Sequence, residues 1–316
     1  MAYTQQSSLS TDQAAFDQIA YFALRSEMLF DAAADVQPVA QSMPGTSVAF
    51  TIFTEMADAT TPLTETSDVT AVAMADSQVS VTLVEYGNAI NTTAKLRGTS
   101  FLDVDAVAAN LIGYNAGSSI DTVVANVLKA ATNVIFGGGG ATTPTSNATV
   151  ESSDILEAND IRLATAQLRK ANAQTFNGMY MAFIHPDVSY DLRRETGAAS
   201  WRDPHVYQNI GQIYNGEIGA FEAVRFVETP RAPLDLTGGS ASTVDLYQTI
   251  IMGRQSLAKA HSTIDGNGAY PSVRRGPVVD SLSRFNPIGW YWLGGYGIFR
   301  QAAIRLINSA SSLGGA

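Results

Sequence analysis

Residues 46–95 constrain the fold most, because they predict a long β-hairpin that cannot bury both of its own faces. The runs TSVAFTIFTEM and SQVSVTLVEYGNAINTT are rich in Val, Ile, Thr, Phe and Tyr, which favour strands. Between them, ADATTPLTETSDVTAVAMAD is acidic and Thr-rich, and predicts a polar, projecting tip. A two-stranded ribbon alone is marginal in water, so this hairpin needs neighbours.

Charge is unevenly spread along the chain. The 316 residues carry a net charge of −10, and nine acids without any Lys or Arg fall between Ser26 and Ala94. An acidic segment set apart in this way suggests contact with a basic partner surface. A solvated loop face is the alternative.

Composition excludes several classes of function. Charged residues make up only 15% of the chain, against about 25% in an ordinary soluble domain, which fits either a sparsely charged surface or large interfaces. The net negative charge argues against extensive nucleic-acid binding. There are no cysteines, which excludes disulfides and thiolate metal sites. Neither a secretory signal nor a membrane span is recognisable, so we expect a soluble, cytoplasmic product.

The first half of the chain predicts mostly helix around the hairpin. Residues 10–30 show an apolar stripe at helical spacing, and residues 31–46 read as irregular. Residues 101–135 predict one long helix or two stacked ones, about 45 Å long if unbroken. The stretch GGGGATTPTSNAT at 137–149 lacks a phosphate-binding motif and predicts a flexible linker at a domain boundary.

The second half predicts a compact α+β unit, because helices and strands intermingle without a βαβα rhythm. EANDIRLATAQLRKANA reads as a helix, and GMYMAFI, EAVRFVET and DLYQTIIMG read as strands. The closing stretch GWYWLGGYGIFRQAAIRLIN is strand-like and aromatic. We expect it to return to the first half and pair beside the long helix.

The stretch AFIHPDVSYDLRRETG, which begins at Ala182, gathers the polar side chains that most resemble an active site. A structural interpretation explains them: His185-Pro186 ends a strand, and Pro186 suits the first turn of a helix. Asp187 then falls early and the arginines late, as the helix dipole favours, and Gly197 stands where a C-cap is expected. A His–Asp catalytic dyad is the alternative.

No other motif predicts catalysis, a cofactor or a metal. The remaining histidines stand alone, and Asp103 and Asp105 lack the rest of a calcium loop, so they read as acids at a helix N-terminus. The region Trp201–His205 is explained by an Asp-Pro turn. We therefore expect no enzyme, no cofactor and no metal ion.

The order of these parts resembles the major capsid proteins of tailed bacteriophages, which have the Hong Kong 97-like capsid fold. VSVTLVEYGNAINTT, AQLRKANAQTFNGMYMAFIHPDVSYDLRRET, GEIGAFEAVRFVETPRA and the closing GWYWLGGYGIFRQAAIRLIN carry the resemblance. It implies an α+β capsid fold of five parts: an N-terminal arm (1–45), an extended β-hairpin loop (46–97), a peripheral domain with a long spine helix (98–151), an axial domain (152–270) and a C-terminal strand returning to the peripheral domain (271–316).

The resemblance also implies a function and partners. Copies of the chain would form pentamers and hexamers and close into an icosahedral shell around double-stranded DNA, without sequence-specific binding and without a membrane. Scaffolding, portal and cement or decoration proteins are further expected partners, and the product is expected in the virion after assembly in the bacterial host cytoplasm. Candidate inter-subunit contacts are the loop acids Glu55, Asp58, Glu65, Asp68 and Asp76, with Arg193, Arg194, Arg274 and Arg275 as possible basic partners.

One departure from the family pattern changes an expectation. Some capsid proteins of this kind cross-link covalently through a lysine on the extended loop, whereas residues 46–94 contain no Lys here. We therefore expect a shell held together without covalent links. Two alternatives stay open at this point: an encapsulin-like nanocompartment shell, and a cytoplasmic enzyme that uses the His185 or Trp201–His205 region.

Overall fold

The computed structural model shows a mixed α+β fold, as the sequence predicts, divided into two units. The first unit contains Gly87–Ala116 and Pro271–Tyr291, and the second contains Ser26–Tyr86, Gly117–Tyr270 and Trp292–Ala316. The residues that the structure describes are 29–39, 46–63, 65–66, 68–100, 103–138, 143–195, 217–262, 270–275, 282 and 284–314. The predicted helix at 10–30 lies almost wholly outside them.

The first unit pairs strands closely. It holds most of β4 (Val84–Thr93), the short helix α1 (Ala94–Thr99), β12 (Ser272–Arg275) and the first part of β13 (Phe285–Ile298). β12 and β4 both pair with β13. Glycine is required where β4 approaches β13, because a Cβ on Gly289 would lie 2.8 Å from the carbonyl oxygen of Asn88.

Residues 104–129 form a single helix, α2 (Val104–Lys129), which decides between the one-helix and two-helix predictions. Its buried stripe repeats every four residues: Ala108, Ile112, Ala116, Ile120, Val124 and Leu128. Gly113 and Gly117 lie within α2 and do not interrupt it. Gly113 faces open space, where an added Cβ would meet no atom within 4 Å, so this glycine weakens the helix without being needed for packing.

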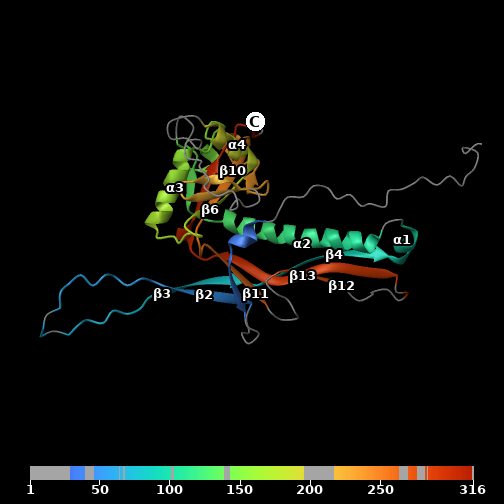
Figure 1. Cartoon of the computed structure of the whole chain (residues 1–316), viewed down its shortest axis with the longest axis horizontal. Helices are drawn as coiled ribbons and strands as arrows, with labels where there is room; N and C mark the ends of the chain where they lie inside the picture. The colour runs from blue at the N-terminus through green and yellow to red at the C-terminus, as the bar shows by residue number, and fades with distance from the viewer. Residues whose placement is uncertain are drawn as a thin grey trace, which may run out of the picture. The chain divides into compact units, whose positions relative to one another are not determined.

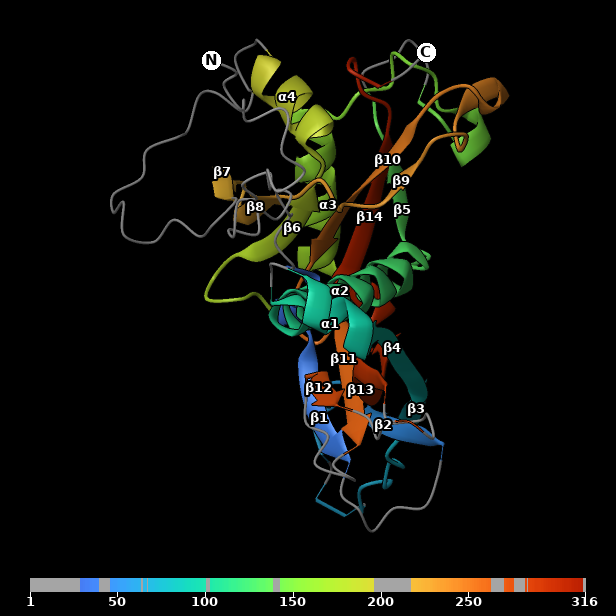
Figure 2. The ribbon, with the colours of Figure 1, turned by 90° about the vertical axis from the view of Figure 1, so that its right-hand side faces the viewer.

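The second unit contains a seven-stranded sheet in the order β5-β14-β10-β6-β8-β7, with β9 paired to β10. The strands are β5 (Val134–Phe136), β6 (Tyr180–Ile184), β7 (Glu217–Phe221), β8 (Val224–Glu228), β9 (Leu234–Asp235), β10 (Leu246–Met252) and β14 (Ile304–Ser309). Helix α3 (Ala158–Lys170) packs against β14 and β5, as Figure 2 shows. Helix α4 (Pro186–Arg194) follows β6, and short 3₁₀ turns lie at Asn147–Thr149, Ser240–Ser242 and Gln301–Ala303.

Two predictions about strands need correction. The closing stretch forms two strands: β13 pairs with β4 of the first half, as predicted, whereas β14 lies between β5 and β10 in the seven-stranded sheet. Every residue of β14 is buried, so its apolar run belongs to a core strand. Residues 31–46, read as irregular, contain a 3₁₀ turn, η2 (Phe30–Ala33), and β1 (Asp35–Val39), which pairs in parallel with β11 (Leu257–Ser262).

The predicted hairpin is confirmed over residues 47–82, whereas residues 84–93, expected in its second strand, form β4 and pair with β13. β2 (Ser47–Phe53) and β3 (Asp76–Thr82) pair antiparallel, from Ser47 opposite Thr82 to Phe53 opposite Asp76. The base is held by burial of Phe50 and Val81 against alanines of β11. Gly295 allows this approach, because a Cβ there would lie 2.1 Å from the carbonyl oxygen of Thr82. Figure 1 shows the connecting segment running away from this base.

Candidate assembly surfaces

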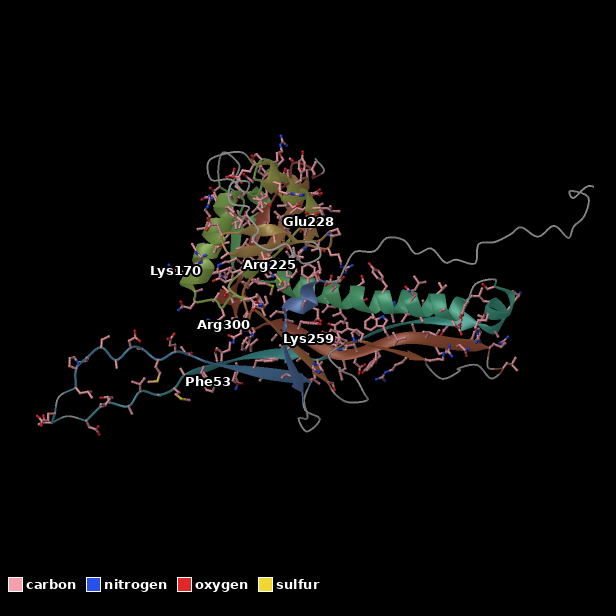
Figure 3. All side chains as sticks on the ribbon, in the orientation of Figure 1. Phe53, Lys170, Arg225, Glu228, Lys259 and Arg300 are labelled. Carbon is pink, nitrogen blue, oxygen red and sulfur yellow. The ribbon has the colours of Figure 1, made fainter. Side chains whose placement is uncertain are left out.

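The hairpin tip, defined as residues 54–75, exposes apolar and acidic side chains together. Its root is closed by a 2.9 Å hydrogen bond from Thr54 N–H to the Ala75 carbonyl, and its described residues are all exposed. Large apolar side chains that are more than half exposed at the root and along the tip are Phe53, Met56, Leu63, Val69, Val72 and Met74 (Figure 3 labels Phe53). A concentration of exposed apolar side chains is typical of an interaction surface.

The predicted acidic contacts lie on this same surface. Glu55, Asp58, Glu65, Asp68 and Asp76 are all exposed. Among the described residues, none of the five carboxylates forms an ion pair within the chain. Their contact with another copy stays a prediction, and the geometry leaves the carboxylates available for it.

Three of the four predicted basic partners already have partners inside the chain. Arg193 Nη2 lies 3.6 Å from a carboxylate oxygen of Glu228, and Arg275 Nη2 lies 3.2 Å from Asp105. The Arg274 guanidinium lies 5.3 Å from the ring centroid of Tyr291. Arg194, in the last turn of α4, is exposed. These internal contacts make at least Arg193 and Arg275 less available to a second chain.

The stretch that raised the question of an active site forms a capped helix start. His185 is the N-cap of α4, and its Nδ1 accepts a 3.3 Å hydrogen bond from the backbone N–H of Asp187. Burial lowers the pKa of His185, although the Asp187 and Glu228 carboxylates oppose the shift. The Tyr247 hydroxyl donates to Asp187 Oδ2 over 2.8 Å, which fixes the carboxylate in place.

The end of this helix differs from the prediction. α4 ends at Arg194 with Glu195 as its C-cap, and Gly197 lies outside the described residues, as does the region Trp201–His205. The polar side chains of the stretch are therefore occupied by capping and by contacts such as the 2.6 Å bond from Ser189 Oγ to Glu228.

The acids at the start of α2 also have structural roles. Asp103 Oδ1 accepts hydrogen bonds from the backbone N–H groups of Asp105 and Ala106, at 3.1 and 3.3 Å. Asp105 itself lies 3.8 Å from Arg97 and 3.2 Å from Arg275. Both carboxylates thus stabilise the helix N-terminus, as predicted.

A buried network at Asp121 holds Leu29 and Phe30 at the start of η2. Asp121 is 2% exposed, and its Oδ1 accepts from Leu29 N–H at 3.1 Å and Phe30 N–H at 3.0 Å. Its Oδ2 accepts a 2.7 Å bond from Arg231 Nε, and the rest of that guanidinium binds Ser118 and Thr122. Hydrogen bonds from two amides and a guanidinium compensate the cost of burying the Asp121 carboxylate.

A second buried ion pair, between Lys259 and Asp31, was not predicted. Lys259 has a side chain 1% exposed, and its Nζ lies 2.7 and 2.9 Å from the two carboxylate oxygens of Asp31. The rings of Tyr270, Trp292 and Tyr296 surround the ammonium, with centroids 4.6, 5.7 and 5.4 Å away. We call these five residues the Lys259 box. In the sequence, the box is marked only by a lysine between two alanines in the strand LAKAHS.

Neither a cluster of metal-type ligands nor a membrane-spanning helix is found among the described residues. They contain no group of three or more His, Cys, Asp or Glu side chains able to hold a metal ion. None of their helices combines the length and apolarity needed to cross a bilayer. The exposed hairpin tip is the most prominent candidate surface, and it is suited to binding protein.

Comparison with known proteins identifies the family. The phage capsid protein family matches residues 5–311. No curated protein matches the sequence.

Solved structures share the fold at low sequence identity. The capsid of Ralstonia phage GP4 is 14% identical with a TM-score of 0.73, covering 96% of each chain. The capsid of cyanophage Pam1 is 15% identical with a TM-score of 0.69, covering 96% of this chain and 98% of that one. The capsid of a native GTA particle is 14% identical with a TM-score of 0.61, covering 97% and 98%. With the family match over nearly its whole length, this chain belongs to the phage capsid proteins, which are structural proteins and not enzymes.

Proposed function

We propose that this chain is the major capsid protein whose copies form pentamers and hexamers and close into an icosahedral head around double-stranded DNA. The observation that carries the proposal is the hairpin tip, whose apolar and acidic side chains are exposed together in the single chain. A surface of this composition is stable in a mature assembly when another copy covers it. The GTA capsid, described with C5 symmetry, is an assembled relative by fold.

The segments of the chain would have the structural roles that they have in a Hong Kong 97-like subunit. Residues 1–45 would be an N-terminal arm, 46–97 the extended loop laid over a neighbour, and 98–151 a peripheral domain with α2 as its spine. Residues 152–270 would be the axial domain around the symmetry axes, and 271–316 the returning C-terminal segment. The long single helix and the confirmed hairpin support this division.

The net charge of the chain supports enclosure of DNA without strong binding to it. A net charge of −10 repels phosphate overall, so the shell would contain the DNA and leave its sequence unread. Portal, scaffolding and cement proteins are the further partners we propose. The assembled product would be part of the virion, after assembly in the cytoplasm of the bacterial host.

The shell would be held together without covalent links between subunits. Residues 46–94 offer no lysine amine to join an amide side chain of a neighbour. Intact particles run on a denaturing gel should therefore give only subunit-sized bands. A ladder of covalent oligomers would contradict this expectation.

Electron microscopy of the purified protein tests the proposal. Negative-stain images, with the mass in solution measured alongside, should show closed shells, tubes, or separate pentamers and hexamers. If the protein alone stays monomeric, co-expression with a scaffolding protein is the decisive second arm. A monomer or dimer that assembles in neither arm refutes the proposal.

A further inference from the structure

One end of the seven-stranded sheet in the second unit carries no acidic residue. β5, β6 and β14 begin at this end and β10 finishes there, because β10 runs antiparallel to β6 and β14, and β5 runs parallel to β14. The four segments that lead into or out of these strands contain neither Asp nor Glu: 129–133, 170–179, 253–256 and 299–303. We call these four segments the acid-free end.

Hydrogen bonds join the acid-free end into one surface. Three of them link different segments: Gly253 N–H to the Ala303 carbonyl at 2.9 Å, Arg254 N–H to the Gln174 carbonyl at 2.8 Å, and the Asn133 side-chain amide to the Gln301 carbonyl. The four segments are therefore held side by side, and their side chains can contact one partner together.

Cations without acidic partners line the acid-free end. Lys129, Lys170 and Arg254 are exposed, and Arg300 is half-buried. Within the part of the chain that the structure describes, none of the four forms an ion pair. Figure 3 labels Lys170 and Arg300, which lie at the same end of the second unit. This surface is thus positive although the whole chain has a net charge of −10.

A buried guanidinium adds to the positive potential of this end. Arg305, near the start of β14, is 9% exposed. Its Nε donates a 3.0 Å hydrogen bond to Gln167 Oε1, and its Nη1 donates to the carbonyls of Ala302 and Ile304 at 3.1 and 2.7 Å. These acceptors are all neutral, and no described carboxylate forms an ion pair with Arg305. A buried cation that no acid of its own chain neutralises favours an anion outside the chain.

The uncharged side chains of the acid-free end suit phosphate better than protein. Amide and hydroxyl side chains recur in it, such as Asn172, Gln174 and Thr175. Together with Lys and Arg, these are the residue types that contact the phosphates of DNA. None of the large apolar side chains that are exposed among the described residues lies in the four segments. The surface therefore lacks the apolar anchors on which binding between proteins usually depends.

We propose that the acid-free end binds the phosphate backbone of the double-stranded DNA inside the shell. The contact would not depend on base sequence, because the cations and amides would meet phosphates and no base edges. Each contact would be weak and sensitive to salt, because it releases counterions and because the rest of the chain repels phosphate. This inference rests on the proposed function, which supplies the enclosed DNA.

The chain has only four lysines, which allows a test on unmodified particles. Lys129 and Lys170 belong to the acid-free end, Lys95 is exposed on α1, and the Lys259 side chain is 1% exposed. DNA-filled heads and empty shells are acetylated with acetic anhydride, and peptide mass spectrometry gives the acetylated fraction of each lysine. Filled heads should show several-fold less acetylation of Lys129 and Lys170 than empty shells. Lys95 should react equally in both, and Lys259 in neither.

A salt titration tests the same contact without a shell. Binding of a short fluorescent DNA duplex to the unassembled full-length protein is followed by fluorescence anisotropy. Four phosphate contacts predict that the logarithm of the association constant falls with the logarithm of salt concentration with a slope of about −3.6. Lys170→Gln/Arg254→Gln should make this slope shallower by about 1.8. The matched control Lys95→Gln/Arg284→Gln, at two exposed cations of the first unit, should leave the slope unchanged.

The outcomes separate this inference from the proposed function. A protein that never assembles, even with a scaffolding protein, refutes the proposed function, and the salt titration then decides whether the surface binds DNA. Equal acetylation of Lys129 and Lys170 in filled and empty shells refutes the inference. A slope that Lys170→Gln/Arg254→Gln does not change refutes it as well. Competition by poly-glutamate as strong as that by unlabelled duplex would assign the surface to an acidic protein segment instead. The acetylation experiment needs no variant, so it stays decisive if the substitutions impair folding.

Discussion

Lys259→Met should lower the free energy of unfolding of the unassembled subunit by about 3 kcal/mol. The substitution keeps the length and most of the apolar volume of the side chain, and removes the ammonium from a site where the side chain is only 1% exposed. Asp31 then stays in place with its carboxylate unpaired. Removing one partner of a buried pair typically costs about 3–5 kcal/mol.

The structure places the expected value at the lower end of that range. The Asp31 side chain is 24% exposed, so water stabilises part of the unpaired charge. Tyr296 also keeps its 2.5 Å hydrogen bond to Asp31 Oδ1. Loss of the contacts between the ammonium and three aromatic rings increases the cost instead, by about 0.5 kcal/mol or more for each ring.

Urea unfolding followed by tryptophan fluorescence measures the effect, because Trp292 is a wall of the Lys259 box. The double variant Lys259→Met/Asp31→Leu is the control. With both charges gone it should be more stable than the single variant, since an apolar pair of similar volume often replaces a buried ion pair at little cost. A single variant as stable as the unmodified protein, or a double variant less stable than the single one, would refute this account.

Four further substitutions test a buried acid, the cap of α4, and the packing around one glycine at the hairpin base and one in α2. Burial raises the pKa of Asp160 to about 6, so between about pH 4 and 6 the folded state holds a proton that the unfolded state has lost. The free energy of unfolding should therefore fall as the pH rises through this range. Asp160→Asn should flatten that slope in urea unfolding measured across the same range. His185→Ala should cost about 1 kcal/mol through loss of the α4 cap, and a larger loss by thermal unfolding would show that His185 does more than cap. Gly295→Ala should destabilise the hairpin base by more than about 2 kcal/mol, because its Cβ would lie 2.1 Å from the Thr82 carbonyl oxygen. Gly113→Ala should stabilise α2 by up to about 1 kcal/mol, because its Cβ would meet no other atom. Equal stability of the two variants in thermal unfolding would contradict this description of the two sites.

Local patterns were sufficient to predict the elements whose shape depends on nearby residues. The alternation of apolar and polar side chains predicted β2 and β3, and a helical apolar stripe predicted α3. His185-Pro186 marked the change from β6 to α4, because proline restricts the residue before it. In each case the neighbours that decide the conformation are close in sequence.

Tertiary partners decided the parts that sequence patterns missed. β1 is a strand because β11, more than 200 residues later, pairs with it in parallel. Nothing near Asp31 indicates that its carboxylate binds Lys259, 228 residues away, or that Asp121 holds Arg231, 110 residues away. The contacts of the possible basic partners were missed for the same reason: nothing near Arg275 or Arg193 in the sequence indicates that the fold brings Asp105 and Glu228 within 3.2 and 3.6 Å of them, and their contact with a second copy stays a prediction.

The fixed register of the hairpin limits how far its tip can reach toward another subunit. The pairing of Phe53 with Asp76, secured by the buried Phe50 and Val81, sets the point from which residues 54–75 extend. Each arm of the tip has about eleven residues, so it reaches at most about 35–40 Å. Under the proposed function, the surface of a neighbour that the tip covers lies within that radius of the hairpin base. Deleting two residues from each arm would shorten the limit by about 7 Å, and the length of this segment would thereby bound the spacing of subunits in the shell.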